Sequence, residues 1–201
     1  MAPRIEAILL AAGESRRMGF PKPLLRIGDE TFLARSINSI LTVVPRLVAV
    51  LGGHAERIRS AIPNDPRIVA VENPRYQAGQ LSSLKVGLGV IGGDADAVLV
   101  HLADHPLVKR STFERAVAEF ASGRGAIVIA RHAGKRGHPV IFAAALFEEL
   151  LSAPEEEGAK AVVNRDPARV VYVEVDDPGV TLDLDTPADL ERAGLAGAPK
   201  P

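Results

Sequence analysis

Residues 5–25 read IEAILLAAGESRRMGFPKPLL, and this stretch decides the fold. It opens with an apolar run that predicts a buried strand, and the run ends in the small-residue turn 11–13. Backbone N–H groups approach an anion closely only where side chains are absent, and arginine and lysine supply the charge that a triphosphate requires. We therefore expect a polyphosphate-binding loop; the alternative is a solvated basic loop after a buried strand. The basic residues and second glycine of this loop are Arg16, Arg17, Gly19 and Lys22.

Length and composition limit the possible classes of protein. The chain has 201 residues, the length of one α/β domain spanning 1–201, and 47% hydrophobic residues supply a core without disulfides. It contains no cysteine, which excludes thiolate chemistry, and its formal net charge of −1 argues against a broad nucleic-acid surface. The N-terminal residues lack the pattern of a signal peptide, and no run is long enough to span a membrane. We expect a cytoplasmic protein.

Strand-like and helix-like patterns alternate along almost the whole chain. After the first strand, the apolar runs lie at 47–51, 68–71, 97–102, 126–130, 140–142 and 170–175. The helical patterns lie at 31–41, 55–61, 81–90, 110–120, 143–151 and 188–193. This order predicts a mostly parallel sheet with helices on both faces, and such sheets bind ligands at the carboxyl ends of their strands. Residues 194–201 are small and proline-bearing, and we expect a flexible tail.

A second candidate site follows the apolar run 97–102. Asp104 lies at the carboxyl end of this expected strand, where one carboxylate can hold Mg²⁺. The alternative is a turn residue, or an N-cap for the helix near residue 110. A zinc site made of Asp104, His101 and His105 is a further possibility, but a continued strand would direct His101 and Asp104 to opposite sides.

A third candidate site is the acidic stretch 181–187, TLDLDTP. In an extended segment Asp183 and Asp185 point to the same side, so they could complete a divalent-metal site with Asp104. The alternative is that Asp185 or Thr186 caps a helix beginning at the following proline. We expect both roles to be present, divided between the two aspartates.

Two further stretches carry polar groups suited to substrates. Residues 73–84, NPRYQAGQLSSL, place small hydroxyl groups at the start of an apolar helix, where they suit a nucleobase or ribose edge. The alternative there is an ordinary helix N-terminus. Residues 131–142, RHAGKRGHPVIF, form a basic hairpin in which Lys135, Arg136 and His138 could take the phosphate of a second substrate. The alternative is a solvated turn between two strands.

Together these residues resemble a known family. Residues 10–22, LAAGESRRMGFPK, are similar to the nucleotidyltransferase signature LAAGxSxRMGxxK. The pattern resembles the MobA/MocA-like group, the molybdenum cofactor nucleotidyltransferases, over nearly the whole chain. The further matches, in chain order, are Asn73 with Gly79 and Ser83-Leu84, Asp104-His105-Pro106, Gly137-His138-Pro139 and Asp183-Leu184-Asp185-Thr186-Pro187.

The resemblance implies a fold, a reaction and a set of site residues. The fold would be the three-layer, Rossmann-like nucleotide-diphospho-sugar transferase (GT-A-like) α/β fold. The reaction would transfer a nucleoside monophosphate from an NTP to a phosphorylated acceptor, with Mg²⁺ as cofactor and release of pyrophosphate. The implied catalytic residues are Arg17, Lys22 and Asp104, and the implied metal ligands are Asp104, Asp183 and Asp185. The implied nucleotide-binding residues are Leu10, Ala11, Ala12, Gly13, Arg17, Lys22, Asn73, Gly79, Ser82 and Ser83, and the implied acceptor-binding residues are Arg136, Gly137 and His138.

The resemblance also bears on the identity of the two substrates. Family members that use GTP usually carry a second glycine where this chain has Ala12, whereas members with LAAG, such as the cytidylyltransferases of the molybdopterin group, use CTP. A methyl group beside the base pocket is a steric reason for the difference. We expect CTP and molybdopterin, and a molybdoenzyme or its chaperone as recipient of the product. His105 stands where the family's metal motif often has glutamine, which bears on the acceptor.

Several rival functions compete with this interpretation. The acceptor could be a sugar or polyol phosphate, or the enzyme could be a GTP-using molybdopterin guanylyltransferase. A nucleotide-binding regulator without turnover is a non-enzymatic rival, which the intact set of acidic positions argues against. A dinucleotide-binding oxidoreductase is disfavoured because Gly13 and Gly19 do not form the G-x-G-x-x-G pattern.

Overall fold

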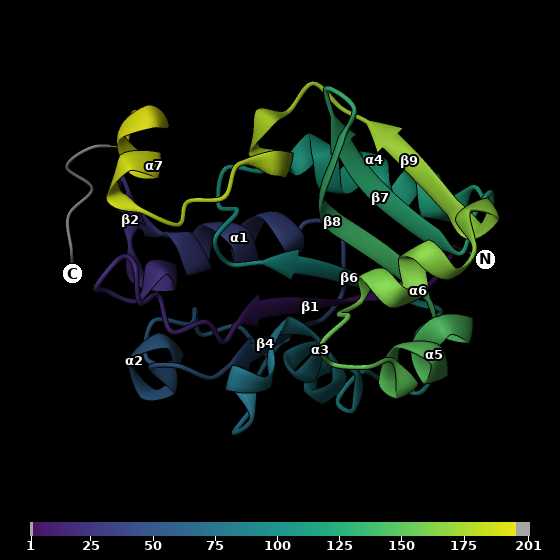
Figure 1. Ribbon diagram of the computed structural model, residues 1–201, viewed down its shortest axis with the longest axis horizontal. Helices are drawn as coiled ribbons and strands as arrows, with labels where there is room; N and C mark the ends of the chain where they lie inside the picture. Colours follow the sequence, from purple (N-terminus) through teal and green to yellow (C-terminus); the bar gives the residue numbers. More distant parts are fainter. Residues whose placement is uncertain (1, 196–201) are drawn as a thin grey trace.

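A computed structural model describes residues 2–195, which build a central sheet of seven strands in the order β5-β4-β1-β6-β8-β7-β9 (Figure 1). The pairs β1–β4, β1–β6, β4–β5 and β7–β9 are parallel, whereas β8 runs antiparallel to β6 and β7. The mostly parallel sheet expected from the sequence is therefore confirmed. The strands are β1 (Ile5–Ala11), β4 (Leu47–Leu51), β5 (Ile68–Glu72), β6 (Ala97–Leu102), β7 (Ile127–His132), β8 (Lys135–Ala143) and β9 (Val170–Glu174).

Helices cover both faces of this sheet. One face carries α1 (Phe32–Ile40), α2 (Ala55–Arg59) and α4 (Arg110–Ala121), and the other carries α3 (Gln80–Leu88), α5 (Phe147–Ser152) and α6 (Lys160–Arg165). A third, smaller cluster joins the hairpin of β2 (Arg26–Ile27) and β3 (Glu30–Thr31) to α7 (Pro187–Arg192). Short 3-10 helices span Lys22–Leu24, Tyr76–Ala78, Ala144–Leu146, Pro167–Arg169 and Pro178–Thr181.

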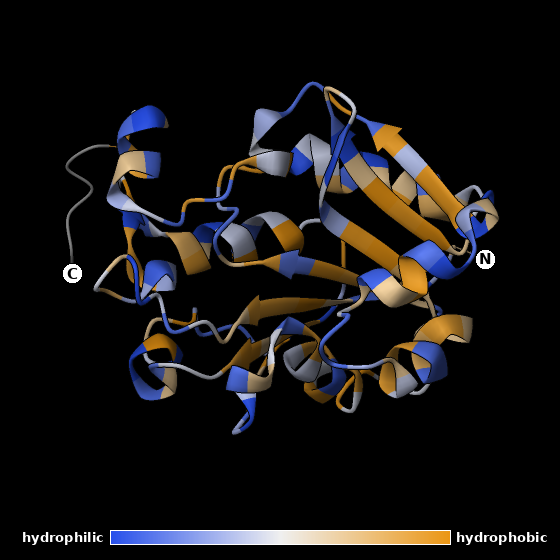
Figure 2. Ribbon diagram, viewed as in Figure 1, coloured by the Kyte–Doolittle hydropathy of each residue, from blue (hydrophilic) through white to orange (hydrophobic). Residues whose placement is uncertain are grey.

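β1 is an inner strand of the sheet, and nearly all of its side chains are apolar. All seven of its residues are buried, and Figure 2 shows the inner strands as mostly hydrophobic. Leu9 packs into the core on one face and Leu10 into the core on the other, as is typical of parallel sheets covered on both sides. Glu6 is the exception: its buried carboxylate accepts a hydrogen bond from Arg46 Nη1 at 2.6 Å.

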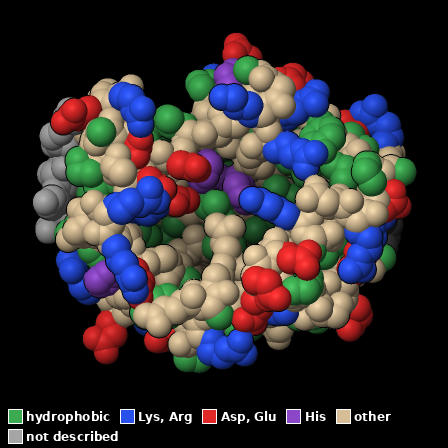
Figure 3. Space-filling model, viewed as in Figure 1, with side chains coloured by type: hydrophobic (Ala, Val, Ile, Leu, Met, Phe, Trp, Pro, Cys, Tyr) green, Lys and Arg blue, Asp and Glu red, His purple; other side chains and the backbone are tan. Residues whose placement is uncertain are grey.

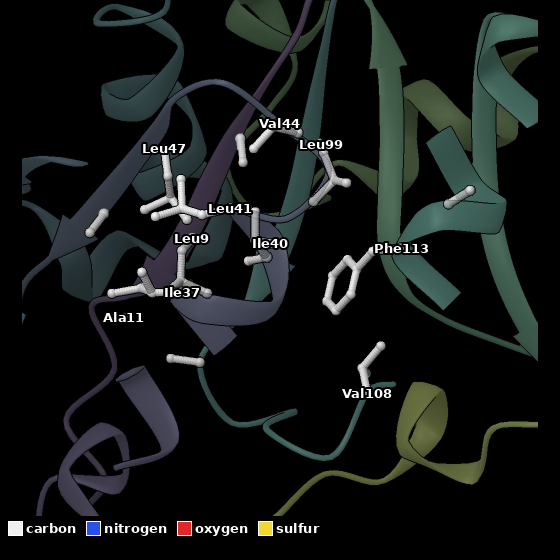
Figure 4. Close-up of a cluster of buried hydrophobic side chains, with 14 of the residues drawn as sticks. Leu9, Ala11, Ile37, Ile40, Leu41, Val44, Leu47, Leu99, Val108 and Phe113 are labelled. Atoms are coloured by element: carbon white, nitrogen blue, oxygen red, sulfur yellow. The ribbon is translucent and has the colours of Figure 1, made fainter. Parts of the chain in front are cut away.

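α1 shows how the helices bury one stripe. Its apolar positions recur at helical spacing, and Leu33, Ile37 and Ile40 are fully buried. Figure 4 shows Ile37 and Ile40 directed toward Leu9 of β1. Thr31 begins the helix, because its hydroxyl oxygen accepts the backbone N–H of Ala34 at 3.0 Å.

The structure adds three features that the sequence pattern did not predict. β8 begins five residues before the expected run 140–142, because the polar residues Lys135 and Arg136 pair with the end of β7. α6 has only one buried residue, Val162, which is too little for a periodic signal. The β2–β3 hairpin is only two residues long on each side. Of the expected tail 194–201, residues 196–201 lie outside the described residues.

No helix within residues 2–195 is both long enough and apolar enough to cross a membrane.

Asp177, in the segment after β9, holds the start of α4 by hydrogen bonds, and removing one of these bonds should lower the free energy of unfolding. This buried carboxylate accepts the Thr112 hydroxyl at 2.6 Å and the Lys109 backbone N–H at 2.8 Å. We expect Thr112→Val to lower the free energy of unfolding by about 1–2 kcal/mol, because Asp177 loses one bond and keeps the others. Urea unfolding measures this loss. Ser122→Ala, which removes an exposed hydroxyl at the end of α4, is the control; an equal loss in both variants would contradict the expectation.

Candidate active site

Two cavities adjoin at the carboxyl ends of β1 and β6. The smaller has a volume of about 230 Å³ and the larger about 850 Å³. They share part of their walls, and Figure 3 shows the hollow on this face. The shared wall residues are Leu10, Gly79, Gln80 and Leu102.

The loop after β1 forms one side of the smaller cavity. The Ala103 N–H donates to the Leu10 carbonyl at 3.0 Å, so the ends of β1 and β6 stay together. Ser15 folds the loop back on itself, because its hydroxyl accepts the Lys22 N–H at 2.9 Å. Gly13 has open space where a side chain would stand, which leaves its backbone free to approach an anion.

Lys22 connects two carboxylates across this cavity. Its Nζ lies 2.6 Å from Asp104 Oδ2 and 2.6 Å from Asp185 Oδ1, and its side chain is only 13% exposed. Burial acts to lower the pKa of Lys22, but the charge of Asp104 and the hydrogen bonds to both carboxylates outweigh burial and raise it. The hydrogen bond from Lys22 lowers the pKa of Asp185, so both groups are charged at neutral pH. Arg17 also pairs with Asp185.

The three carboxylates expected to hold a metal ion do not converge on one point, and the metal role of Asp183 stays a prediction. Within residues 2–195 no three acidic or histidine side chains are placed to hold a metal ion together. Asp183 Oδ1 lies instead 2.6 Å from His105 Nε2, and it lines the larger cavity. The segment is not a strand, and the fully buried Leu184 between the two aspartates bonds the Asp104 carbonyl through its N–H. Asp183 and Asp185 therefore face different partners.

The remaining pair still fits a divalent cation. Asp104 and Asp185 come from distant parts of the chain and converge on one point, where the Lys22 ammonium is the cation. Mg²⁺ in proteins is commonly held by one or two carboxylates together with phosphate oxygens and water. The zinc site is not supported, because His101 is fully buried against Phe113 and its Nε2 faces the His105 carbonyl.

The geometry also decides which residues cap the helices. Asp104 does not cap α4, which begins after Lys109 without a side-chain cap of its own. Thr186, not Asp185, caps α7, through a capping box with Asp189. Neither Asp183 nor Asp185 caps α7, so the expected division of the capping and metal roles between these two aspartates is wrong.

Most of the expected nucleotide-binding residues line the smaller cavity, and three do not. Arg17 lies outside this wall, paired with Asp185. Asn73 is buried behind the wall, where its Nδ2 donates to Ser82 Oγ at 2.9 Å and to Ser83 Oγ at 3.0 Å. Asn73 and Ser82 therefore support the start of α3, the role that an ordinary helix N-terminus predicts. The expected residues in the wall are Leu10, Ala11, Ala12, Gly13, Lys22, Gly79 and Ser83.

Sequence reasoning missed several wall residues of the smaller cavity. Tyr76 and Gln80 lie in the stretch 73–84 that the sequence singled out, but neither residue type by itself indicates a ligand. The other missed residues are Ser15, Pro23, Leu102 and Ala103.

The β7–β8 hairpin brings the expected acceptor-binding residues into the larger cavity. Arg136, Gly137 and His138 all line it. Gly137 is required by close packing, because a Cβ there would overlap the Val180 backbone. His138 Nδ1 faces the Val100 carbonyl oxygen at 3.4 Å.

Comparison with known proteins agrees with this arrangement. A family model described as MobA-like NTP transferase domain matches residues 7–170. The chain belongs to this family of nucleotidyltransferases. Its members act on nucleoside triphosphates and phosphorylated acceptors. The fold of the family, expected from the resemblance, is confirmed by the sheet and by solved structures of similar proteins.

Several similar proteins carry names or structures of their own. The molybdenum cofactor cytidylyltransferase of Escherichia coli K12 is 27% identical over 94% of this chain and 95% of that protein. The 2-C-methyl-D-erythritol 4-phosphate cytidylyltransferase of Rhodococcus jostii is 33% identical, over 62% of this chain and 54% of that protein. The crystal structure of Rv0371c from Mycobacterium tuberculosis superimposes with a TM-score of 0.81 at 31% identity, covering 96% of this chain and 98% of that one. A second structure of Rv0371c is a complex with manganese.

In this member of the family, buried histidines make stability depend on pH. Burial lowers the pKa of His138 to about 4, and burial also lowers the pKa of His101 well below its usual range. Unfolded histidine binds a proton near pH 6.5, so between pH 6.5 and 4 the unfolded chain holds more protons. Stability is thus present above this window and is lost as pH falls through it.

We expect the free energy of unfolding to fall by about 1.4 kcal/mol per pH unit for each such histidine across the window. Urea unfolding at pH 7, 6 and 5 measures the slope. His138→Gln should have a shallower slope by about one proton, and an unchanged slope would show that His138 does not stay neutral in the fold.

Proposed function

We propose that this chain is a cytidylyltransferase that transfers CMP from CTP to the phosphate of molybdopterin or Mo-molybdopterin and releases pyrophosphate. The observation that carries the proposal is the cluster of Lys22, Asp104 and Asp185 at the smaller cavity, which shares part of its wall with the larger one. The cluster offers charged groups for a triphosphate, and the adjoining cavity offers room for a second substrate.

The choice of CTP rests on the shape of the smaller cavity. Ala12 is part of its wall, and its methyl group narrows the space that a bare glycine would leave. The named function of the similar Escherichia coli protein supports the same choice.

The reaction is an in-line displacement that needs no nucleophilic side chain. An oxygen of the acceptor phosphate attacks the α-phosphorus of CTP, and the bond from this phosphorus to the bridging oxygen of the pyrophosphate breaks. The backbone at Gly13 binds the triphosphate. Lys22 and Arg17, which pair with Asp185 before the reaction, stabilise the negative charge of the departing pyrophosphate. Held by Asp104 and Asp185, Mg²⁺ would neutralise the charge that gathers on the phosphate oxygens.

A second candidate function differs only in the acceptor. The partial similarity to the Rhodococcus jostii enzyme favours a polyol phosphate such as 2-C-methyl-D-erythritol 4-phosphate. The volume of about 850 Å³ favours the larger molybdopterin, because a small acceptor would leave much of this cavity to water. The same site could also transfer a nucleotide to a sugar phosphate, or use GTP in place of CTP with molybdopterin.

Pyrophosphate release tests the proposal. CTP, GTP, ATP and UTP are each supplied with Mg²⁺, and with molybdopterin, 2-C-methyl-D-erythritol 4-phosphate or no acceptor. We expect release with CTP and molybdopterin, and none after Mg²⁺ is removed with a chelator. Release with GTP would overturn the base assignment, and release only with the polyol phosphate would overturn the acceptor assignment.

The biological setting belongs to the same proposal. The finished cofactor would be a molybdopterin cytosine dinucleotide, so a molybdoenzyme or its chaperone would receive it. The cytoplasm is the compartment that we propose for this transfer.

A further inference from the structure

Polar groups of two opposite kinds divide the larger cavity. Figure 3 shows acidic, histidine and basic side chains following one another across the central hollow. Apolar side chains, among them Val140 and Phe142, line much of the rest. One group of wall residues is Asp183, His105 and His138. The basic wall residues are Lys135, Arg136 and Lys160, and the acidic run Glu155–Glu157, just before Lys160, also lines the cavity. A ligand that fills this cavity has to match both ends.

The histidine end offers hydrogen-bond acceptors. The Val100 carbonyl can only accept, so His138 Nδ1, at 3.4 Å from it, carries the hydrogen, and Nε2 is left with a free lone pair. Burial lowers the pKa of His138 to about 4, which keeps this ring neutral at pH 7.

A carboxylate stands beside this imidazole and also accepts. The rings of His138 and His105 are 5.4 Å apart, and His105 Nε2 lies 2.6 Å from Asp183 Oδ1. The Asp183 side chain is 66% exposed, so its carboxylate is accessible to a ligand in the cavity. A ligand at this end therefore has to present N–H or O–H donors.

The basic residues Lys135, Arg136 and Lys160 form no ion pair within residues 2–195, although Glu156 and Glu157 line the same wall. Arg136 Nη1 donates only to the neutral amide oxygen of Asn164, at 3.3 Å. The nearby carboxylates of Glu155 and Glu174 are taken by other arginines, at 2.8 Å and 2.7 Å. The three basic residues line the larger cavity alone, whereas Lys22 and Asp104 line the smaller one alone. An anion at the basic end is thus separate from the reacting phosphate.

We propose that the larger cavity selects its acceptor at two points. The N–H edge of an uncharged ring binds His138 and Asp183, and a second anionic group of the acceptor, apart from the reacting phosphate, binds Lys135, Arg136 and Lys160. This inference rests on the proposed function, because an aminopyrimidinone ring such as that of a pterin carries adjacent N–H donors of this kind. A sugar or polyol phosphate offers no such ring.

Binding of two matched fluorescent rings tests the first point without turnover. Pterin carries a 2-amino group, and lumazine carries a carbonyl oxygen in its place on the same bicyclic framework. We expect the protein to bind pterin at least about tenfold more tightly than lumazine in a fluorescence titration. The 2-amino group of pterin can donate to the acceptors of the protein, whereas the carbonyl oxygen of lumazine at that position cannot. His138→Phe should abolish this preference, and His138→Gln, which retains an acceptor, should keep part of it.

The second point is tested with 6-carboxypterin, which adds an anionic group to the same ring. We expect 6-carboxypterin to bind several-fold more tightly than pterin, and Lys160→Ala to remove most of that gain. Arg165→Ala is the matched control on the same helix, since this exposed arginine pairs with Glu149 and does not line the cavity. The gain should persist in this control.

Equal binding of pterin and lumazine, absence of pterin binding at millimolar concentration, or an unchanged preference in His138→Phe would overturn the inference. An unchanged gain in Lys160→Ala would overturn the assignment of the anion. The pyrophosphate assay is independent of these titrations. If pyrophosphate is released with CTP and molybdopterin but pterin is not preferred, the proposed function stands and the inference fails. If pterin is preferred but no pyrophosphate is released, the two binding points stand and the proposed function fails.

Discussion

Lys22→Ala should lower kcat for pyrophosphate release by about a thousandfold, the largest effect that we expect of a single substitution. The ammonium of Lys22 is the cation shared by Asp104 and Asp185. In the proposed reaction, the same charge would stabilise the negative charge that develops on the departing pyrophosphate. Steady-state kinetics with saturating CTP and acceptor measure the loss.

The control for this experiment lies in the same loop. Arg16 is exposed and pairs with Glu14, so Arg16→Ala should change kcat by less than about threefold. Lys22→Ala also leaves two carboxylates without their shared cation, so urea unfolding of both variants shows whether lost activity follows lost structure. A folded Lys22→Ala variant with kcat near that of the unchanged protein would overturn the role assigned to Lys22.

Gly137→Ala should lower the free energy of unfolding by about 3 kcal/mol, the upper part of the range for overpacking. A Cβ at this position would stand 2.7 Å from Val180 Cγ1 and closer still to the Val180 carbonyl oxygen. The nearest obstacle is the backbone of Val180, so relief requires β8 and the segment Pro178–Thr181 to separate. Urea unfolding measures the change.

Gly93→Ala is the matched control for this substitution. A Cβ at Gly93 meets no atom within 4 Å, and we expect a change of less than about 0.5 kcal/mol. If the Gly137→Ala protein is too unstable for urea titration, its thermal unfolding midpoint gives the same comparison. A loss below about 1 kcal/mol would contradict the close packing of Gly137 against Val180.

Local pattern predicted the parts of the fold in which pattern and environment agree. The strands at 5–11, 47–51 and 97–102 are buried on both faces, so a continuous apolar run identified them. The helical stripe of α1 was likewise visible as periodicity. The polar start of β8 was not visible, because its strand conformation depends on pairing with β7.

The candidate site divides in the same way. The order of motifs indicated that the loop after β1, Asp104 and the hairpin 131–142 serve one site, because the carboxyl ends of parallel strands lie at one edge. The sequence could not show that Asp185 pairs with Lys22 while Asp183 pairs with His105. That difference depends on the burial of Leu184 between them, which is a tertiary contact. Nor could the sequence show that Asn73 donates a hydrogen bond to Ser82 and that neither residue lines the smaller cavity.

The amino-acid sequence by itself determined the alternating α/β order, the strand-to-loop turn at 11–13 and the kinds of charged groups that the loop brings. These are local properties, set by apolar runs, glycine positions and helix caps within a few residues. Only the tertiary structure decided that Asp185 is the second carboxylate, besides Asp104, that pairs with Lys22. It also decided which residues form the shared wall of the two cavities. Those partners are distant in the sequence, and their pairing depends on strand order and close packing, which local pattern does not encode.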